Sequence, residues 1–331
     1  QKHTTNLLPL KTFENPVAGI NNYWSNGRSM DNRCFEVTVT TKPVVSKDFN
    51  IELGASVGHY ENKIKTLPND DKLYVDGVKN AQGYTSSIYG TDNIATIVGQ
   101  PVGSFYGYKT AGVFATDAQA KAAGNNDYLY YLDETGAKQY FKAGDMHFVD
   151  INKDGKIDEA DKTIIGNPNP DIYGNIFGSV MWKNFTLTLG LNYSLGNDVY
   201  NYSRSVLESG SNFYNQTIAM ANRWRHEGQV TDMPRLSYGD PMGNARFSDR
   251  WIEDGSYLRL KTVNISYKVP VKGDWIQGLT IWAEANNLFT ITKYLGSDPE
   301  FSAANGVLYQ GIDPGNVALS RTFTFGMKIN L

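Results

Sequence analysis

The last stretch of the chain decides the fold: RTFTFGMKINL, residues 321–331. Its side chains alternate without an error between an apolar face and a face of small or polar residues. The apolar face holds Phe323, Phe325, Met327, Ile329 and Leu331. A period of two is typical of a strand with one apolar and one wet face. Because strands of a transmembrane β-barrel have lipid on one face and a polar lumen on the other, we predict a barrel wall strand here.

The composition is compatible with such a barrel and excludes other classes of protein. The 331 residues carry a net charge of −3 with a pI near 5.9, which gives no electrostatic footprint for nucleic acid. No run approaches the roughly 20 apolar residues of a membrane helix. The mean hydropathy of −0.42 does not argue against barrel strands, since these expose only every second residue to lipid.

The rest of the chain is predicted to be all-β. Eight further strands are expected, at 35–40, 49–57, 88–98, 104–114, 173–182, 185–193, 257–269 and 279–289. Residues 1–34 are rich in Asn, Gly and Pro and are expected to form an extracellular loop. Residues 35–331 are then the C-terminal portion of the barrel, with long extracellular loops at 115–172 and 196–256.

The connections between these strands alternate in length. Short ones are expected at 46–48, 99–103, 183–184 and 270–278, and long ones at 61–87, 115–172, 196–256 and 290–320. Outer-membrane barrels have this pattern of tight turns at one rim and long loops at the other, whereas a secreted β-sandwich has no reason for it. Nine strands is an odd number, and an open sheet in lipid leaves backbone groups unpaired. We therefore expect the C-terminal part of a larger barrel, whose earlier strands are absent from this sequence.

One loop contains a motif with specific chemistry, DINKDGKIDEAD at residues 150–161. Oxygen-bearing side chains and a central Gly155 follow the spacing of an EF-hand calcium loop, which folds its ligands around one ion. Asp161 replaces the usual glutamate, so weaker ligation is expected. The alternative is a metal-free surface turn. The predicted ligands of a structural Ca²⁺ are Asp150, Asn152, Asp154, Asp158 and Asp161 by their side chains and Lys156 by its carbonyl.

The sequence shows no catalytic constellation, and we expect a protein that is not an enzyme. The histidines at 3, 59, 147 and 226 are scattered, and none forms a pair with metal-ligand spacing. There is no nucleophile elbow and no phosphate loop. The number of loop carboxylates alone leaves a glycosidase pair open.

Aromatic residues of the loops permit two interpretations: they stack on a sugar or peptide, or they pack the loops together. They are Tyr128, Tyr130, Tyr131, Tyr140, Tyr200, Tyr202, Phe213, Tyr214, Trp224 and Trp251. The residues that bind substrate therefore remain unassigned. Four other aromatic residues are expected in a belt at the membrane interface, namely Trp182, Tyr193, Tyr267 and Trp282.

Several segments resemble the C-terminal part of SusC-like TonB-dependent outer-membrane transporters, the SusC/RagA family. These segments are GQPVGSFYGYKTAGVF (99–114), Gly144-Asp145 before the Asp-rich loop, IIGNPNP (164–170), YLRLK (257–261), NNLF (286–289) and SRTFTFG (320–326). The terminal Leu331 is a departure, because an aromatic residue is more usual there.

The resemblance implies the following. Such proteins are outer-membrane barrels of about 22 strands, with an N-terminal plug and a TonB box upstream of this chain. They work with a SusD-like surface lipoprotein as a lid, often as a dimer of such pairs. They import oligosaccharides or peptides, driven by the TonB complex. The expected partners are therefore these proteins, the upstream half of the barrel, the substrate and outer-membrane lipid. The alternative function is a secreted or surface calcium-dependent β-rich binding module or adhesin.

Overall fold

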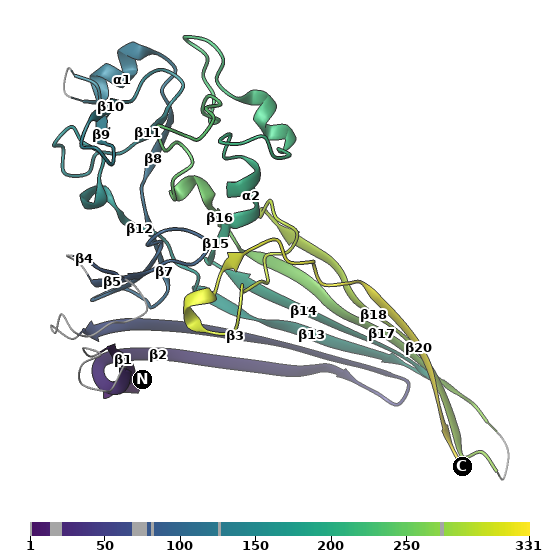
Figure 1. Ribbon diagram of the computed structural model, residues 1–331. Helices are drawn as coiled ribbons and strands as arrows, with labels where there is room; N and C mark the ends of the chain where they lie inside the picture. The colour runs from purple at the N-terminus through teal and green to yellow at the C-terminus, as the bar shows by residue number, and fades with distance from the viewer. Residues whose placement is uncertain (1, 14–21, 68–77, 81–82, 125–126, 272–274) are drawn as a thin grey trace.

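Eight long antiparallel strands form one curved sheet, the wall sheet, which runs the length of the molecule (Figure 1). The computed structural model describes residues 2–13, 22–67, 78–80, 83–124, 127–271 and 275–331. In spatial order, the strands are β1 (Lys2–Phe13), β2 (Asn22–Val45), β3 (Phe49–Thr66), β13 (Ile172–Trp182), β14 (Phe185–Leu195), β17 (Tyr257–Val269), β18 (Gly278–Thr292) and β20 (Thr322–Asn330).

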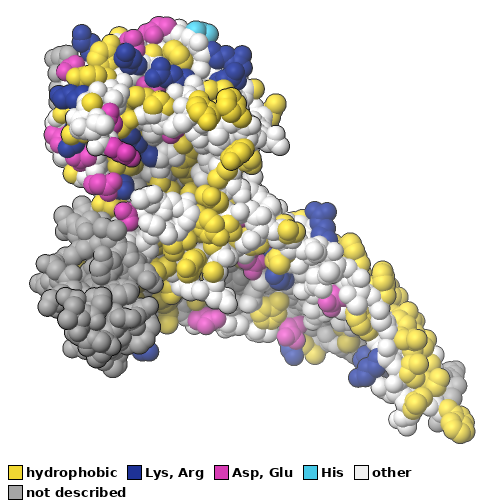
Figure 2. Space-filling model, viewed as in Figure 1, with side chains coloured by type: hydrophobic (Ala, Val, Ile, Leu, Met, Phe, Trp, Pro, Cys, Tyr) yellow, Lys and Arg dark blue, Asp and Glu magenta, His cyan; other side chains and the backbone are white. Residues whose placement is uncertain are grey.

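The strand register gathers the apolar side chains on one face of this sheet. Leu189 lies opposite Val263, and Ile281 lies opposite Met327. Apolar side chains on this face remain exposed, with Met327 at 69% and Phe325 at 79% of full exposure. Figure 2 shows hydrophobic atoms along the narrow end of the sheet. The other face carries mostly polar and small side chains, with Phe177, Met181 and Trp282 among them, so the two faces of the wall differ as predicted for the last strand.

The polar face is held together by hydrogen bonds between neighbouring strands. The Asn264 side-chain amide donates to Glu284 Oε2 over 3.0 Å, and the Thr262 hydroxyl donates to Asn286 Oδ1 over 3.0 Å. On the apolar face, Trp182, Phe185 and Tyr267 form an aromatic group at the short-turn end, with ring centroids 4.4 Å apart for the last two. Trp282 does not belong to such a belt, because it pairs with Gly326 and its ring covers that glycine on the polar face.

Short turns and long connections lie at opposite ends of the wall sheet (Figure 1). The turns β2–β3, β13–β14 and β17–β18 are at one end, near the C-terminus. At the other end, four small sheets pack beyond the wall. Their strands are β4 (Val78–Asn80), β5 (Gly83–Ser86), β6 (Ile94–Ile97), β7 (Ser104–Gly107) and β12 (Thr163–Gly166); β8 (Thr110–Val113) and β11 (Met146–Phe148); β9 (Tyr130–Leu132) and β10 (Lys138–Tyr140); and β15 (Asp198–Asn201), β16 (Ile252–Asp254) and β19 (Ile312–Asp313).

Helices are short and belong to this loop end. They are α1 (Asp117–Ala123), α2 (Tyr202–Leu207) and the 3₁₀ turns η2 (Glu159–Asp161), η3 (Ile218–Asn222), η4 (Asp249–Trp251) and η5 (Val307–Tyr309). Across the described residues, none of the helices combines the length and apolar character needed to cross a membrane. Two buried clusters form the core here, one around Phe114, Phe141 and Phe148 and the other around Phe105 and Trp251.

Contacts between distant loops join the loop end into one body. Asp145 is fully buried and accepts from Arg235 through both carboxylate oxygens, each over 2.9 Å, which links 115–172 to 196–256. The pairing of β15 with β16 and β19 adds residues 293–321. The long loops are therefore a packed, hydrogen-bonded layer.

The expectation that residues 1–34 form a loop is wrong. β1 and β2 pair from Lys2–Asn32 to Phe13–Asn22, so most of this segment is strand. Backbone pairing does not need alternating side chains, and this polar sequence gives no period-two signal. Pro9 stands beside a register shift, where a strand tolerates a residue without an N–H group.

Two predicted wall strands, 88–98 and 104–114, are not in the wall. β6 and β7 are covered on both faces and belong to a small sheet at the loop end. The connection at 99–103 lies at that end too, where Gln100 O accepts from Ile64 N of β3 over 3.1 Å. With these two segments removed from the nine expected strands and β1 added, the described wall has eight strands, since β6 and β7 are buried in the loop-end core.

Candidate functional site

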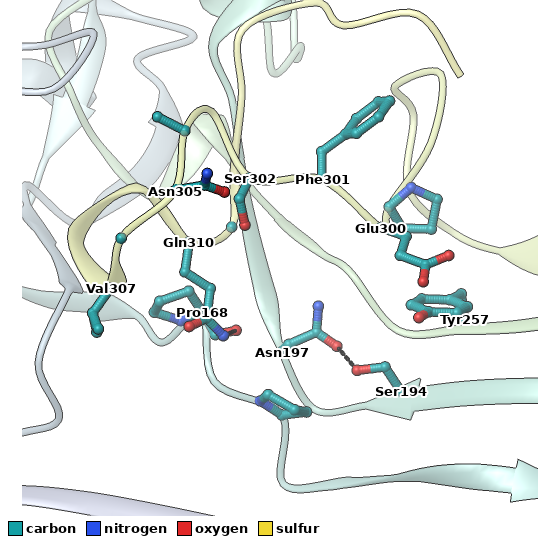
Figure 3. Close-up of a pocket in the computed structure, with 15 residues that line it drawn as sticks. Pro168, Ser194, Asn197, Tyr257, Glu300, Phe301, Ser302, Asn305, Val307 and Gln310 are labelled. Atoms are coloured by element: carbon teal, nitrogen blue, oxygen red, sulfur yellow. Dashed lines mark hydrogen bonds between the residues drawn. The ribbon is translucent and has the colours of Figure 1, made fainter. Parts of the chain in front are cut away.

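A cavity of about 560 Å³ opens at the loop end of the wall, beneath residues 299–311 (Figure 3). Its polar lining comes from the ends of β14 and β17 and from this loop. The Ser194 hydroxyl donates to Asn197 Oδ1 over 2.8 Å, and Tyr257 lies next to Glu300. The labelled lining residues are Pro168, Ser194, Asn197, Tyr257, Glu300, Phe301, Ser302, Asn305, Val307 and Gln310.

Arg259 fixes the loop that covers this cavity. Its side chain is 2% exposed on the polar face of β17, where the YLRLK alternation places it. It donates to Glu300 Oε2 over 2.8 Å, to Thr290 Oγ1 over 2.9 Å and to Asp298 Oδ1. Asp298 also accepts from Glu300 N and Leu319 N, over 2.9 and 3.2 Å. Through these charge-assisted hydrogen bonds, Arg259 and Asp298 hold both ends of the covering loop on the wall.

A second cavity of about 280 Å³ continues the first along the polar face. Ser194 and Tyr257 line both cavities, and Tyr173, Asn175 and Glu36 line only the second. Carboxamides, hydroxyls and three tyrosines thus border one hollow on the inner side of the sheet. Such groups hold a polar ligand reversibly by hydrogen bonds and ring contacts.

The Asp-rich loop is folded by its own backbone. Asp150 accepts from Lys153 N over 2.6 Å and from Gly155 N over 2.7 Å. Asn152 accepts from Asp154 N over 3.0 Å, and Asp154 accepts from Lys156 N over 2.8 Å. Lys153 and Gly155 have positive φ angles of 62° and 82°, which make the sharp turn.

The end of this loop is a capped 3₁₀ turn. Asp158 accepts from Ala160 N over 2.8 Å, while Asp161 accepts from Ile151 N and Asp158 N, both over 2.9 Å. Burial raises the pKa of Asp161. The hydrogen bond from the Lys156 ammonium lowers the pKa of Asp158, and the two side chains form an ion pair.

The six predicted ligands lie in one turn, and their donor set is all oxygen, as Ca²⁺ prefers. Their carboxylates, however, accept backbone amides or pair with lysine. In the portion of the chain that the structure describes, no group of three or more His, Cys, Asp or Glu is placed to hold a metal ion. The calcium site stays a prediction.

The loop aromatics divide into residues that pack the loops together and residues that are exposed. Tyr130 and Tyr128 pack on Tyr140, with centroids 6.0 and 6.4 Å apart, and Trp251 is fully buried. Phe213 and Tyr214, in contrast, are 90% and 72% exposed. The cavity residues Asn197, Tyr257 and Glu300 were not predicted as a site. The polar phase of 257–261 was the available signal, but only the fold brings 298–300 to it.

Comparisons with known proteins agree with this architecture. TonB-dependent receptor P3 of Formosa agariphila is 28% identical over 326 residues, covering 94% of this chain and 30% of that protein. TonB-dependent receptor SusC of Bacteroides thetaiotaomicron is 29% identical over 316 residues, covering 91% and 26%. The chain thus spans about a third or less of the length of these relatives. No family model matches the chain.

Solved structures of the RagAB peptide importer share the fold. The "open-open" state superimposes with a TM-score of 0.72 at 20% identity, over 99% of this chain and 32% of the other. The RagAB peptide transporter gives 0.71 at 22% identity, with the same coverage. In sequence the chain is therefore similar to SusC-type TonB-dependent receptors over about a third or less of their length, and in fold it is similar to the RagAB transporter structures.

Proposed function

We propose that the complete protein imports oligosaccharides or peptides across the outer membrane, and that this chain supplies the last part of its barrel wall and outer loops. The observation that carries the proposal is the two-faced wall sheet with a polar hollow of about 560 Å³ on its inner side. A wall with an apolar outer and a polar inner face suits a lipid-embedded pore. The hollow suits reversible binding, so the protein acts as a transporter and not as an enzyme.

In this proposal the substrate is captured under a SusD-like lipoprotein lid, and the TonB complex supplies energy through the upstream part of the protein. The names of the relatives support TonB dependence, and the RagAB structures support a peptide as one cargo class. Two such pairs would form the assembly.

The test is to purify the full-length protein from native outer membranes and to weigh the intact complex by mass spectrometry. We expect a lipoprotein partner and bound cargo, and we expect a deletion strain to lose growth on one polymer or peptide source. Recovery of the protein without detergent, as a soluble monomer, would contradict the proposal and favour a secreted calcium-dependent binding module or adhesin.

We also propose that the 150–161 loop takes a structural Ca²⁺. Calorimetry of the full-length protein with CaCl₂ should show one site, and EDTA should increase hydrogen exchange in 150–161. Asp154→Asn should remove the heat. Asp133→Asn, in another Asp-centred turn of the same region, serves as control and should leave it unchanged. No heat with the unaltered protein would show that the loop is a metal-free turn.

A further inference from the structure

A third pocket, of about 410 Å³ and more enclosed than the two at the wall, lies in the loop layer. It is bordered by the loop 87–93, by the start of β12 with η2, by β15 with α2, and by residues 245–251. Tyr89 and Tyr202 supply aromatic surface, and Glu159 and Lys162 supply charge. Its aromatic and charged lining differs from the amide-rich hollow beneath 299–311.

The loop that displays Tyr89 is held rigidly by side chains. Asn93 is fully buried and makes two bonds to the Ile88 backbone, accepting from its N over 2.9 Å and donating to its O over 2.8 Å. Ser87 and Asp92 close the loop, since Asp92 N donates to Ser87 Oγ over 3.0 Å. The position of Tyr89 is thus fixed before any ligand arrives.

Tyr89 itself adopts an uncommon backbone conformation. Its φ of 54° lies in the left-handed region, which a bulky residue rarely adopts without support from its surroundings. The buried Tyr200 hydroxyl donates to Tyr89 O over 2.8 Å, and the Tyr89 ring packs against Tyr202 with centroids 4.8 Å apart. Although it is held on these sides, the side chain is 44% exposed. Strain kept at an exposed aromatic residue beside a pocket is typical of a ligand clamp.

The polar groups of the pocket suit an uncharged, hydroxyl-rich ligand. Lys162 Nζ lies 2.9 Å from Glu159 Oε2, so the pair is neutral as a whole while it offers both donors and an acceptor. Arg246 is surrounded by the rings of Tyr108, Tyr131, Phe141 and Phe148 at 5.0–5.8 Å and donates to Met242 O over 3.1 Å, so its guanidinium is already engaged by these contacts. A sugar ring has a flat C–H face for an aromatic side chain and hydroxyls at its edge for such a pair.

We infer that this pocket binds one ring of a neutral oligosaccharide, stacked on Tyr89 and hydrogen-bonded by Glu159 and Lys162. The inference rests on the proposed import function and narrows its substrate class to saccharides. The pocket is an outer subsite that holds a part of the chain while another part lies in the hollow at the wall.

The test uses the full-length transporter in detergent, with its partner if one copurifies, and calorimetry with maltohexaose, cellohexaose, xylohexaose and mannohexaose. At least one should bind. Tyr89→Gly removes the ring and also relieves the left-handed strain, so folding is retained while affinity falls about tenfold. Tyr89→Phe should keep the affinity within about twofold, because the ring face remains. Tyr238→Ala is the control, since Tyr238 is equally aromatic, 75% exposed and outside the pocket.

The outcomes separate this inference from the import function. If no hexasaccharide binds while a tryptic casein digest does, the pocket is not a saccharide site, but import of peptides stands. If a hexasaccharide binds equally well to Tyr89→Gly and to the unaltered protein, the inference is wrong and import of sugars stands. If cells lacking the gene take up every one of these probes normally, the proposed function itself fails.

Discussion

At the scale of single residues, Arg259 anchors the hollow at the wall. Its guanidinium is buried with Asp298 and fixes a long loop at two points. Removing one partner of a buried ion pair leaves the other charge without compensation. Arg259→Gln should therefore lower the free energy of local opening of residues 293–321 by about 3–5 kcal/mol, measured by hydrogen exchange of the full-length protein.

Lys261→Gln provides the matched control for Arg259. Lys261 lies on the same strand, 3.7 Å from the same Glu300, but it is half-exposed. Its loss should change the opening free energy by less than about 1 kcal/mol. Equal effects of both substitutions would show that the loop does not depend on Arg259.

A second residue-scale prediction concerns pH and Asp133. Hydrogen bonds from the Thr135 hydroxyl, from the Ala137 amide and from Gln139 lower the pKa of Asp133 from 3.8 to about 2. A lowered pKa stabilises the turn above pH 3.8, and this contribution is lost as the pH falls through 2. Hydrogen exchange of residues 130–140 should increase over that interval. Asp133→Asn does not titrate and should show no such step; a step in that variant would assign it to another group.

At the scale of elements, close approach of strands makes particular glycines necessary. A Cβ atom at Gly174 would stand 2.1 Å from Ser56 O of the neighbouring strand β3, which cannot move without disturbing the pairing. A Cβ at Gly190 of β14 would meet nothing nearer than 3.9 Å. Gly174→Ala should destabilise the barrel by about 1–3 kcal/mol, and Gly190→Ala by less, in urea unfolding of the full-length protein in vesicles. The reverse order would contradict the register of β13 with β3.

Sequence periodicity predicted the strands that have one apolar and one polar face. It did not identify strands whose sequence lacks this alternation of apolar and polar residues. The strands 173–182, 185–193 and 322–330 show apolar alternation because one of their faces is exposed and apolar, and the structure confirms them. The sequence of β1, residues 2–13, does not alternate and gave no signal. The segments 88–98 and 104–114 do contain strands, but these strands are buried around Phe105 at the loop end and are not part of the wall. Neither the Arg259–Asp298 pair nor the Tyr89 clamp was predictable, because each joins segments far apart in sequence.

At the scale of the whole molecule, we expect a lysine introduced on one face of the wall to have the opposite effect from a lysine introduced on the other face. Leu189 lies on the apolar face of β14 and Thr188, its neighbour, on the polar face. Leu189→Lys should destabilise folding into vesicles by about 2–4 kcal/mol, while Thr188→Lys should be tolerated because its side chain enters a wet lumen. Heat-modifiable mobility on gels and urea unfolding would measure both. Equal tolerance would show that the apolar face is not in lipid.

The loop layer is joined by β15, β16 and β19 and by the bond between Asp145 and Arg235. This joining affects the entropy change when a ligand binds to the loops. Flexible loops that close on a ligand lose conformational freedom at that moment, and the loss weakens binding. Here the ordering is completed when the chain folds, so a ligand meets a preformed surface. The affinity for a ligand should then depend on the contacts that the ligand makes and not on the ordering of loops. The heat-capacity change of binding should be close to that expected from the ligand surface that is buried.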